Sequence, residues 1–319
     1  MRLSIIIPIY KSERWIGRCL DSIYSQGIEE ALFEVICIID GSPDNSIKVV
    51  RERQVCHNNL VIVEQDNNGV SMARNRGIDE SRGDYVMFVD SDDTFFEHSL
   101  SEILSSLASD DAEIIVTRCF TKEYEWVPWN HLFNDGDIIK TDNAIKKGYL
   151  RGCVWGACYN RRFIIKNSIR FVEKVSNGED SLFFMTCMYF AHAIMFKDVK
   201  LYNVVEECGS LSRTYNEKKV YDIIGYLPIL DNYLNRIPVI KNKTFVFQYV
   251  RYSWLSALVL RTIRTKGVGL HTLKKAKISK YANFTIDNDV IVLRKKMKIM
   301  KWSFSLFYLL TWIKERTLR

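Results

Sequence analysis

Three carboxylates stand within four residues at the point where an apolar segment ends. Asp90, Asp92 and Asp93 follow residues 85–89, a run of Tyr, Val, Met, Phe and Val that is typical of a strand buried inside a sheet. Carboxylates packed this closely repel one another and lose hydration unless a cation joins them. Oxygen ligands suit Mg²⁺ or Mn²⁺, and such ions commonly bridge to a substrate phosphate. The segment therefore predicts a metal–diphosphate site, and a solvated acidic turn that caps the next helix is the alternative.

Side chains suited to binding a base or an anion follow other apolar segments. Tyr10 ends the first of these, where its ring could stack on a planar group such as a nucleobase. Asp40 ends the second, where its carboxylate could accept the N–H of a base. Arg74 lies in the first turns of a helix that follows Asn68 and Gly69, and a helix N-terminus with an arginine binds anions. Each feature alone is common as a boundary aromatic, a helix cap or a solvent-facing helix start.

Two later segments could supply proton transfer and charge stabilisation. Asp180 follows Gly178 and Glu179 and precedes a strongly apolar helix. A carboxylate at such a position can act as a general base, and the alternative is a charge that complements the helix dipole. Arg213 lies in a loop of Gly and Ser residues, where it could offset charge that develops on a leaving group.

The elements that would position these residues alternate between strand and helix over the first hundred residues. Continuous apolar strands separated by helices are typical of a parallel sheet in a doubly wound α/β fold. The carboxyl ends of such strands open on one rim, where ligands bind, so we expect Tyr10, Asp40 and Asp90 to share that rim. The expected strands are residues 3–8, 33–39, 60–63 and 85–89, and the expected helices are residues 15–25, 46–53 and 71–81.

The rest of the chain is less regular and then becomes helical. We expect a catalytic domain over residues 1–215 and a helical, basic region over residues 216–319. The pattern predicts strands at residues 114–117 and 124–127, and helices at residues 141–150, 179–190, 220–235 and 244–264.

Taken in order, these segments resemble the family-2 inverting glycosyltransferases, which have the nucleotide-diphospho-sugar GT-A fold. The resemblance is close over residues 1–95, patchy to residue 215 and absent beyond. Its motifs are specific to the family and do not identify the sugar. Many relatives carry an aspartate where this chain has Ile39. The matching segments are residues 4–10 (SIIIPIY), 39–44 (IDGSPD), 68–75 (NGVSMARN), 88–93 (FVDSDD) and 178–180 (GED).

The resemblance implies a site for a nucleotide-diphospho-sugar donor, which we expect to be a UDP-sugar. Asp92 would hold a Mn²⁺ or Mg²⁺ ion that bridges the diphosphate and acts as a Lewis acid on the departing nucleotide. Asp180 would be the catalytic base that takes a proton from an acceptor hydroxyl, so that a single displacement inverts the anomeric carbon. The nucleotide-binding residues would be Pro8, Tyr10 and Asp40 at the base, Asp90 on the ribose side, Asn68 and Arg74 at the helix start, and Arg213 at the leaving diphosphate.

The resemblance also implies a metal-dependent hexosyltransferase that moves one sugar per event. The acceptor would be a hydroxyl of a glycan or of a lipid-linked acceptor in bacterial surface polysaccharide biosynthesis. The alternatives are a nucleotidyltransferase and a catalytically inactive nucleotide-sugar-binding protein. Residues 11–15 lack the Gly-rich basic loop of a nucleotidyltransferase, and the presence of both Asp92 and Asp180 favours an active enzyme.

The composition of the 319-residue chain excludes a disordered protein, since 47% of residues are apolar and 13% aromatic. The eight cysteines form no C-x-x-C pair and no zinc-like cluster with histidine, so we interpret them as buried thiols in a reducing cytosol. The N-terminus lacks the features of a secretory signal, and no run reaches the ~20 apolar residues that span a bilayer. We therefore expect a cytoplasmic protein.

Charge is concentrated at the end of the chain. Residues 261–319 contain 15 Lys+Arg and 3 Asp+Glu, a net charge of +12, so residues 1–260 carry −5 of the total of +7. Tryptophan and lysine beside the apolar residues 304–313 suit an interfacial helix on an anionic membrane, at the inner face of the cell membrane. The alternative is a helix that packs on the protein core. We expect no nucleic-acid partner, because the aromatic residues here lie in one apolar run and do not alternate with basic residues.

Overall fold

The structure is a computed structural model that divides into two compact units. The first comprises Met1–Ala144 with Tyr149–Glu207, and the second comprises Ile145–Gly148 with Cys208–Arg319. The described residues are 1–107, 112–120, 125–126, 132–147, 149, 152–175, 178–205, 215–240, 243, 245–284 and 294–317.

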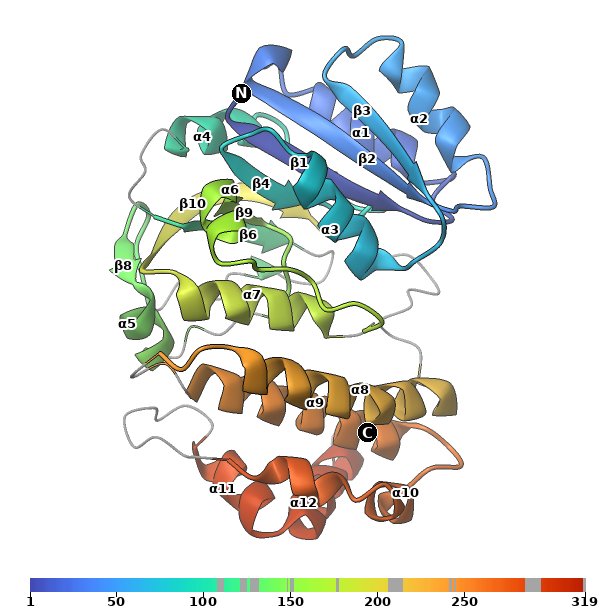
Figure 1. Ribbon diagram of the computed structural model, residues 1–319, viewed down its shortest axis with the longest axis vertical. Helices are drawn as coiled ribbons and strands as arrows, with labels where there is room; N and C mark the ends of the chain where they lie inside the picture. Colours follow the sequence, from blue (N-terminus) through green and yellow to red (C-terminus); the bar gives the residue numbers. More distant parts are fainter. Residues whose placement is uncertain are drawn as a thin grey trace. The chain divides into compact units, whose positions relative to one another are not determined.

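The first unit is built on a mixed β-sheet (Figure 1). Its described strands are β1 (Leu3–Ile9), β2 (Phe33–Asp40), β3 (Leu60–Gln65), β4 (Tyr85–Phe88), β5 (Thr94–Phe95), β6 (Ile114–Phe120), β7 (Glu125–Trp126), β8 (Ile138–Lys140), β9 (Ala157–Asn160) and β10 (Ala193–Asn203). They follow the order β3-β2-β1-β4-β9-β6-β10-β5, with β7 beside β6 and β8 beside β10. Strands β1 to β4 pair in parallel, as do β6 and β10, whereas β9 runs antiparallel between β4 and β6. The predicted α/β class with a mostly parallel sheet is confirmed.

Helices of the first unit connect these strands in the expected alternation. The predicted helix over residues 71–81 forms as α3, one residue earlier at each end, and α5 covers only the first part of the predicted helix at residues 141–150. The helices are α1 (Ile16–Tyr24), α2 (Ser46–Gln54), α3 (Val70–Glu80), α4 (Ser99–Ser106), α5 (Thr141–Lys146), α6 (Arg161–Lys166) and α7 (Glu179–Phe190), with a short 3₁₀ turn, η1, at Glu30–Leu32.

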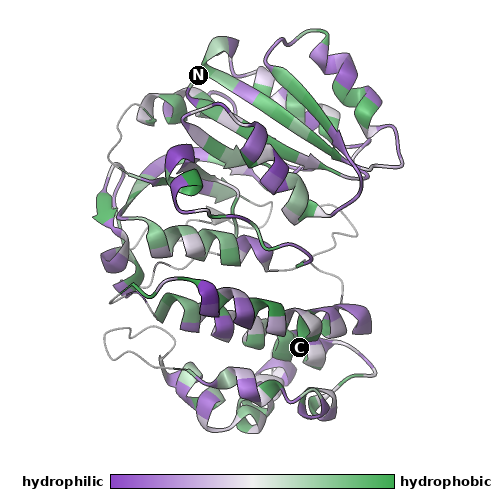
Figure 2. Ribbon diagram, viewed as in Figure 1, coloured by the Kyte–Doolittle hydropathy of each residue, from purple (hydrophilic) through white to green (hydrophobic). Residues whose placement is uncertain are grey.

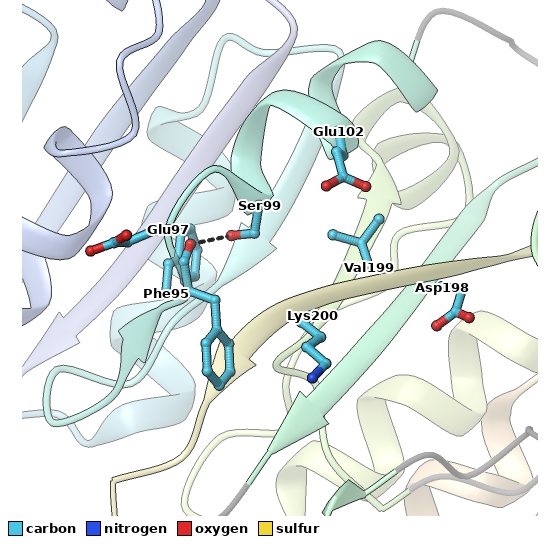
Figure 3. Close-up of a pocket in the computed structure, with 8 residues that line it drawn as sticks. Phe95, Glu97, Ser99, Glu102, Asp198, Val199 and Lys200 are labelled. Atoms are coloured by element: carbon cyan, nitrogen blue, oxygen red, sulfur yellow. Dashed lines mark hydrogen bonds between the residues drawn. The ribbon is translucent and has the colours of Figure 1, made fainter.

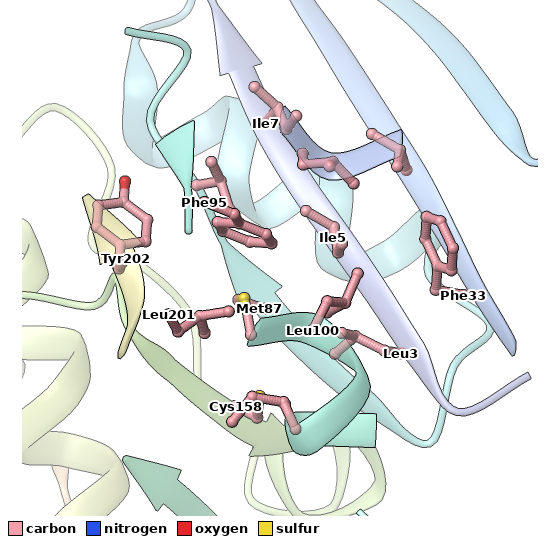
Figure 4. Packing of buried hydrophobic residues seen from close by; sticks show 14 of the residues in the cluster. Leu3, Ile5, Ile7, Phe33, Met87, Phe95, Leu100, Cys158, Leu201 and Tyr202 are labelled. Atoms are coloured by element: carbon pink, nitrogen blue, oxygen red, sulfur yellow. The ribbon is translucent and has the colours of Figure 1, made fainter. Parts of the chain in front are cut away.

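One face of the sheet packs against α1 and α4. Alternate residues of β1 point to this face, where Leu3, Ile5 and Ile7 join Leu20 of α1 and Leu100 of α4 in one buried cluster (Figure 4). Figure 2 shows the same division, with hydrophobic residues along β1 and β2 and hydrophilic residues on the outer side of α2. Among the cysteines that the structure describes, Cys56 is exposed and the others are buried, which confirms the interpretation of the buried ones as small core residues.

The opposite face is covered by α3 and by an aromatic cluster. Gly77 of α3 lies so close to β1 that a Cβ there would come within 2.2 Å of Ile6 Cγ2. Further along this face, the rings of Phe88 and Phe171 meet edge to face at 5.1 Å, and those of Phe171 and Phe183 stack at 4.1 Å. Because Phe183 belongs to α7, this cluster holds that helix on the sheet.

The described part of the second unit is helical, as the sequence predicts. Phe307 of α12 packs on Tyr252 of α9 at a ring distance of 6.1 Å, and Arg264 of α9 donates to Glu315 of α12 at 2.7 Å. In the described part of the chain, every helix is too short or too polar to cross a membrane. The elements are α8 (Glu217–Arg236), α9 (Phe245–Arg264), α10 (Leu270–Lys275), η3 (Ile278–Ala282), α11 (Arg294–Trp302) and α12 (Phe304–Thr317).

Candidate active site

Parallel pairing brings several predicted residues to one rim of the sheet. Strand β1 pairs in parallel with both β2 and β4, so the carboxyl ends of all three lie at the same edge. Tyr10 follows β1, Asp40 ends β2, and Asp90 lies two residues after β4. Pro8 lies in β1 near that edge and is half-buried. The shared rim expected from the sequence is therefore present in the structure.

Arg74 joins two segments that lie far apart in the sequence. Its Nη2 donates to Asp90 Oδ1 at 2.8 Å, and its Nη1 forms an ion pair with Asp180. Glu179 Oε1 lies 3.7 Å from the same Nη1. The guanidinium lies over the ring of Phe171 at 5.3 Å, and the side chain is only 3% exposed. A buried arginine thus links the acidic loop after β4 to the acid pair that opens α7.

Negative charge exceeds positive charge in this cluster. Asp90, Glu179 and Asp180 surround the single guanidinium of Arg74, which leaves two negative charges unbalanced when all three acids are ionised. Burial raises the pKa of the Asp180 carboxyl to about 8, although the Arg74 guanidinium opposes that rise. Such a carboxyl has the proton affinity that a general base needs near neutral pH.

The loop after β4 is held by a tyrosine from another strand. Tyr202 of β10 accepts a hydrogen bond from the Asp90 backbone N–H at 2.9 Å and donates its hydroxyl proton to Asp93 Oδ2 at 2.7 Å. The backbone N–H of Val205 donates to the other oxygen of Asp93 at 2.8 Å. Asp93 is buried, and burial together with the nearby Asp90 raises its pKa to about 8. Asp93 therefore anchors the loop, while Asp90 and Asp92 remain half-exposed.

Asp40 positions the turn that begins α3. Its Oδ1 accepts hydrogen bonds from Gln65 Nε2 at 2.8 Å and from the Asn68 backbone N–H at 2.9 Å, and its Oδ2 accepts from the Gly69 backbone N–H at 2.9 Å. The buried carboxylate thus fixes the start of the helix that carries Arg74. The predicted contacts of Asp40 with a base and of Asn68 with the nucleotide stay predictions.

The remaining nucleotide-binding predictions differ in their surroundings. Tyr10 is 43% exposed, and Lys11 Nζ lies over its ring at 5.2 Å from the ring centre. Gly41 has φ of 58°, and a Cβ there would come within 2.6 Å of the Asn67 backbone nitrogen, so this turn requires glycine. Arg213 lies outside the described residues.

The side chains of the 90–93 loop fit a divalent ion that shares its ligands with a substrate. Asp92 is half-exposed, and its backbone oxygen accepts from Arg18 Nη2 at 3.0 Å. Across the described ranges, no three His, Cys, Asp or Glu side chains are grouped so as to hold a metal by themselves. An Mg²⁺-like ion typically takes one or two carboxylates from the protein and completes its shell with phosphate and water. The donor set at Asp90 and Asp92 matches that pattern.

Sequence reasoning missed the residues that hold the acids in place. Tyr202 was missed because strand β10 was not predicted, although a tyrosine at the carboxyl end of a parallel strand was a usable signal. Tyr202 in turn contacts Trp155. Their rings stack at 5.1 Å. Phe171 carries no recognisable motif, and only the fold brings it under the guanidinium of Arg74.

A separate pocket of about 610 Å³ lies between the start of α4 and strand β10 (Figure 3). It contains none of the predicted site residues, and its charged groups are mixed in sign. The lining residues are Phe95, Phe96, Glu97, Ser99, Glu102, Asp198, Val199 and Lys200.

Two glycosyltransferases match about two thirds of this chain. The glycosyltransferase GlyA of Streptococcus pneumoniae is 27% identical over 236 residues, which are 70% of this chain and 33% of GlyA. The poly(ribitol-phosphate) beta-glucosyltransferase of Bacillus spizizenii is 26% identical over 215 residues, which are 66% of this chain and 33% of that relative. The chain therefore spans about a third of the length of both relatives.

Solved structures of similar shape support the fold. Residues 1-349 of S. aureus TarS, in complex with UDP-GlcNAc, match with a TM-score of 0.73 at 19% identity, over 100% of this chain and 93% of that one. The mannosyltransferase PcManGT from Pyrobaculum calidifontis, in complex with GDP-Man and Mn²⁺, matches with a TM-score of 0.57 at 15% identity, over 98% and 87%. These likenesses show the fold alone, and it is the GT-A fold that the sequence motifs imply. The family described as "Glycosyl transferase family 2" matches residues 4–168, more than half of the chain, so the chain belongs to glycosyl transferase family 2.

Proposed function

We propose that the protein is an inverting, metal-dependent hexosyltransferase that moves one sugar from a UDP-sugar to a hydroxyl of a glycan or lipid-linked acceptor. Residues 1–215 would carry catalysis, and residues 216–319 would bring the enzyme to the cytoplasmic face of the cell membrane. One observation supports this function above all others: buried Arg74 joins Asp90 and Asp180 at one rim. The Bacillus spizizenii relative, a poly(ribitol-phosphate) beta-glucosyltransferase, supports an acceptor in surface polysaccharide synthesis.

The donor would lie along the rim formed by the ends of β1, β2 and β4. The base would stack on the ring of Tyr10 beside Pro8, while Asp40 and Asn68 would contact its polar edge. Asp90 would lie on the ribose side. The UDP-GlcNAc bound in the TarS structure supports a UDP-sugar as donor. Arg213 would hold the diphosphate as it leaves.

A divalent ion would be held by Asp92 with help from Asp90. When bound, it supplies positive charge to the bridging diphosphate oxygens and makes the nucleotide a better leaving group. The excess negative charge around Arg74 favours such an ion, because a diphosphate would otherwise approach a cluster of its own sign. The Mn²⁺ in the PcManGT complex supports Mn²⁺ or Mg²⁺ as the ion.

Asp180 would act as the general base. The acceptor hydroxyl would give its proton to a carboxylate oxygen of Asp180 while the hydroxyl oxygen forms a bond to the anomeric carbon. The bond from that carbon to the diphosphate oxygen breaks on the opposite face, so the configuration inverts in one displacement. Arg74 keeps Asp180 oriented, since its Nη1 pairs with Asp180 while its Nη2 is bonded to Asp90.

The test is release of UDP from a panel of UDP-sugars with Mn²⁺ or Mg²⁺. Slow hydrolysis by water suffices, so no acceptor is needed. We expect release from one sugar, abolished by a chelator and by Asp92→Ala, and retained by Glu52→Ala, which removes an exposed acid from α2. Absence of release from every UDP-sugar, together with absence of metal-dependent UDP binding, would overturn the UDP assignment. GDP- and dTDP-sugars in the same assay would then identify another donor.

A further inference from the structure

Helices α11 and α12 have two different faces. One face packs inside the second unit, where Phe304 and Phe307 are buried and Phe307 contacts Tyr252. Glu315, also on this face, accepts a hydrogen bond from Arg264 of α9 at 2.7 Å. The helix pair is therefore anchored to its own unit and does not depend on another partner for its position.

The other face exposes large apolar side chains. Trp302 is 81% exposed, Leu309 48%, and Leu310 and Ile313 each 45%. Contact between water and several large apolar side chains is unfavourable, and soluble monomers rarely expose such side chains together. A cluster of such residues on one helix pair therefore indicates a surface that is covered in use.

The exposed apolar side chains of α12 form one stripe. Helix α11 ends with the bond from the Ser303 backbone N–H to Ile299 at 2.8 Å, and Ser303 then caps α12 by accepting from the Leu306 backbone N–H through its hydroxyl at 3.2 Å. Side chains three or four positions apart lie on the same side of a helix. The stripe on α12 therefore consists of Leu306, Leu309, Leu310 and Ile313, in which Leu306 is half-buried, and exposed Trp302 is the last residue of α11.

Exposed lysines share the side of α11 that carries Trp302. Lys298 lies four residues before Trp302, and Lys295 lies three residues before Lys298, so both share the side of Trp302, and both are exposed. Exposed Lys314 lies beside the end of the stripe on α12. Long lysine side chains can bury their stems in apolar surroundings and keep the ammonium among phosphates.

We propose that this surface, the α11–α12 face, docks on an anionic membrane leaflet. Charge complementarity favours this occupant, because the lysines that flank the stripe would repel the same face of a second copy. Tryptophan at the headgroup level, aliphatic residues below it and lysines around it match an interfacial helix pair. The proposal deepens the proposed function, since it rests on the idea that the enzyme works at a membrane where a lipid-linked acceptor is available.

The test is co-sedimentation of the full-length protein with vesicles of phosphatidylcholine, with and without phosphatidylglycerol. We expect binding to the anionic vesicles to exceed binding to the neutral ones by about tenfold and to fall with added salt. The variant Trp302→Glu with Leu310→Glu should lose most of this binding. Val55→Glu is the matched control, since Val55 is 86% exposed in the first unit. It should bind as the wild type does.

Quenching of tryptophan fluorescence by brominated lipids distinguishes insertion of the protein into the bilayer from adsorption on its surface. The quenching should fall markedly in Trp302→Phe. Equal binding by the double variant and the control, or no quenching, would overturn the proposal. A change of oligomeric state in the double variant, with vesicle binding intact, would assign the face to a second copy.

UDP release in solution keeps the two proposals distinguishable. The double variant should release UDP at the wild-type rate without vesicles, which also shows that it is folded. Vesicle binding by a protein that releases no UDP would leave docking in place and overturn the assignment of a UDP-sugar as donor.

Discussion

At the scale of single residues, the candidate site depends on one buried cation. Arg74 is in contact with Asp90 and Asp180, which lie 16 and 106 residues away in the sequence. A buried charge is stable only where a partner of opposite sign compensates for its lost hydration. Removing any one of these three residues would therefore leave a buried charge without compensation. Substitutions that keep the shape of a side chain and remove only its charge therefore test the role of each residue best.

Asp180→Asn should abolish transfer while preserving the donor site. The amide has nearly the shape of the carboxylate but does not accept a proton, so we expect kcat to fall by about 10²–10⁴. Calorimetric UDP binding in the presence of Mn²⁺ should change little. Glu179→Gln, the neighbouring acid on α7, is the control and should keep most of its activity. The reverse result would identify Glu179 as the base.

The activity should follow the deprotonation of one buried carboxyl, that of Asp180. Burial raises the pKa of Asp180 to about 8, and only its deprotonated form accepts a proton from the acceptor. We therefore expect kcat/KM to fall about tenfold per pH unit below pH 8 and to level off above it. Initial rates across this range measure the profile, and a rate that is flat from neutral to alkaline pH would contradict the assignment.

Tyr202→Phe should weaken the metal–diphosphate site without unfolding the protein. The change deletes only the hydroxyl that bridges the Asp90 N–H and Asp93. With a pKa of about 8 the Asp93 carboxyl is mostly neutral near pH 7, and an ordinary hydrogen bond contributes about 0.5–1.5 kcal/mol, so Mn²⁺-dependent UDP affinity should fall by roughly two- to tenfold. Titration calorimetry measures it. Tyr159→Phe, which removes a hydroxyl bonded to Val154 at 3.0 Å, is the control, and equal losses in both would show a general packing effect.

At the scale of elements, close packing of α3 on β1 determines where Arg74 lies. Gly77 allows the helix to approach the strand, and the buried Asp40 carboxylate fixes the turn before it through Asn68 and Gly69. The position of the guanidinium is thus determined by two rigid contacts, one at the start of the helix and one in its second half.

Gly77→Ala should destabilise the first unit. The added methyl would meet Ile6 Cγ2 at 2.2 Å, and overpacking of this kind costs about 1–3 kcal/mol. Gly225→Ala in α8 is the matched control, since no atom lies within 4 Å of its Cβ position. Alanine there should stabilise the helix by up to about 1 kcal/mol. Urea unfolding measures both, and the same sign for both variants would contradict the packing argument.

At the scale of the whole molecule, the net positive charge is concentrated in the last part of the second unit. Residues 261–319 carry a net charge of +12, and the rest carry −5. The candidate residues that the structure describes all belong to the first unit. The exposed apolar stripe with its lysines belongs to the second. We therefore expect chemistry and surface attachment to depend on different parts of the chain.

Donor binding should raise the thermal stability of the protein only when metal is present. A ligand at 100 times its Kd stabilises the native state by about 2.7 kcal/mol, which corresponds to a rise in Tm of roughly 5–10 °C for a unit of this size. We expect UDP with Mn²⁺ to give this shift in a thermal melt. UDP with a chelator, or Asp92→Asn with both ligands, should give almost none. A shift that persists with the chelator would exclude Asp92 as a metal site.

The sequence alone determined the class of the fold and most elements of its first part. The spacing of apolar residues, the turn residues and the helix starts are local signals. The strands that lead to Tyr10, Asp40 and Asp90 could therefore be predicted from neighbouring residues. The same signals located Arg74 and Asp180 at helix starts. Strand β9 was not predicted because it has only four residues, and strand β10 was not predicted because its apolar pattern is interrupted by the charged residues Lys197, Asp198 and Lys200.

Only the tertiary structure decided which of these residues meet. The sheet order and the packing of α3 and α7 bring Arg74 to both Asp90 and Asp180, and Tyr202 to the loop that ends at Asp93. It also showed that the two interpretations of the last helices are compatible, since one face packs and the other is exposed. The physical reason is the same in each case: contacts between distant residues depend on how elements pack, and local sequence patterns do not encode that packing.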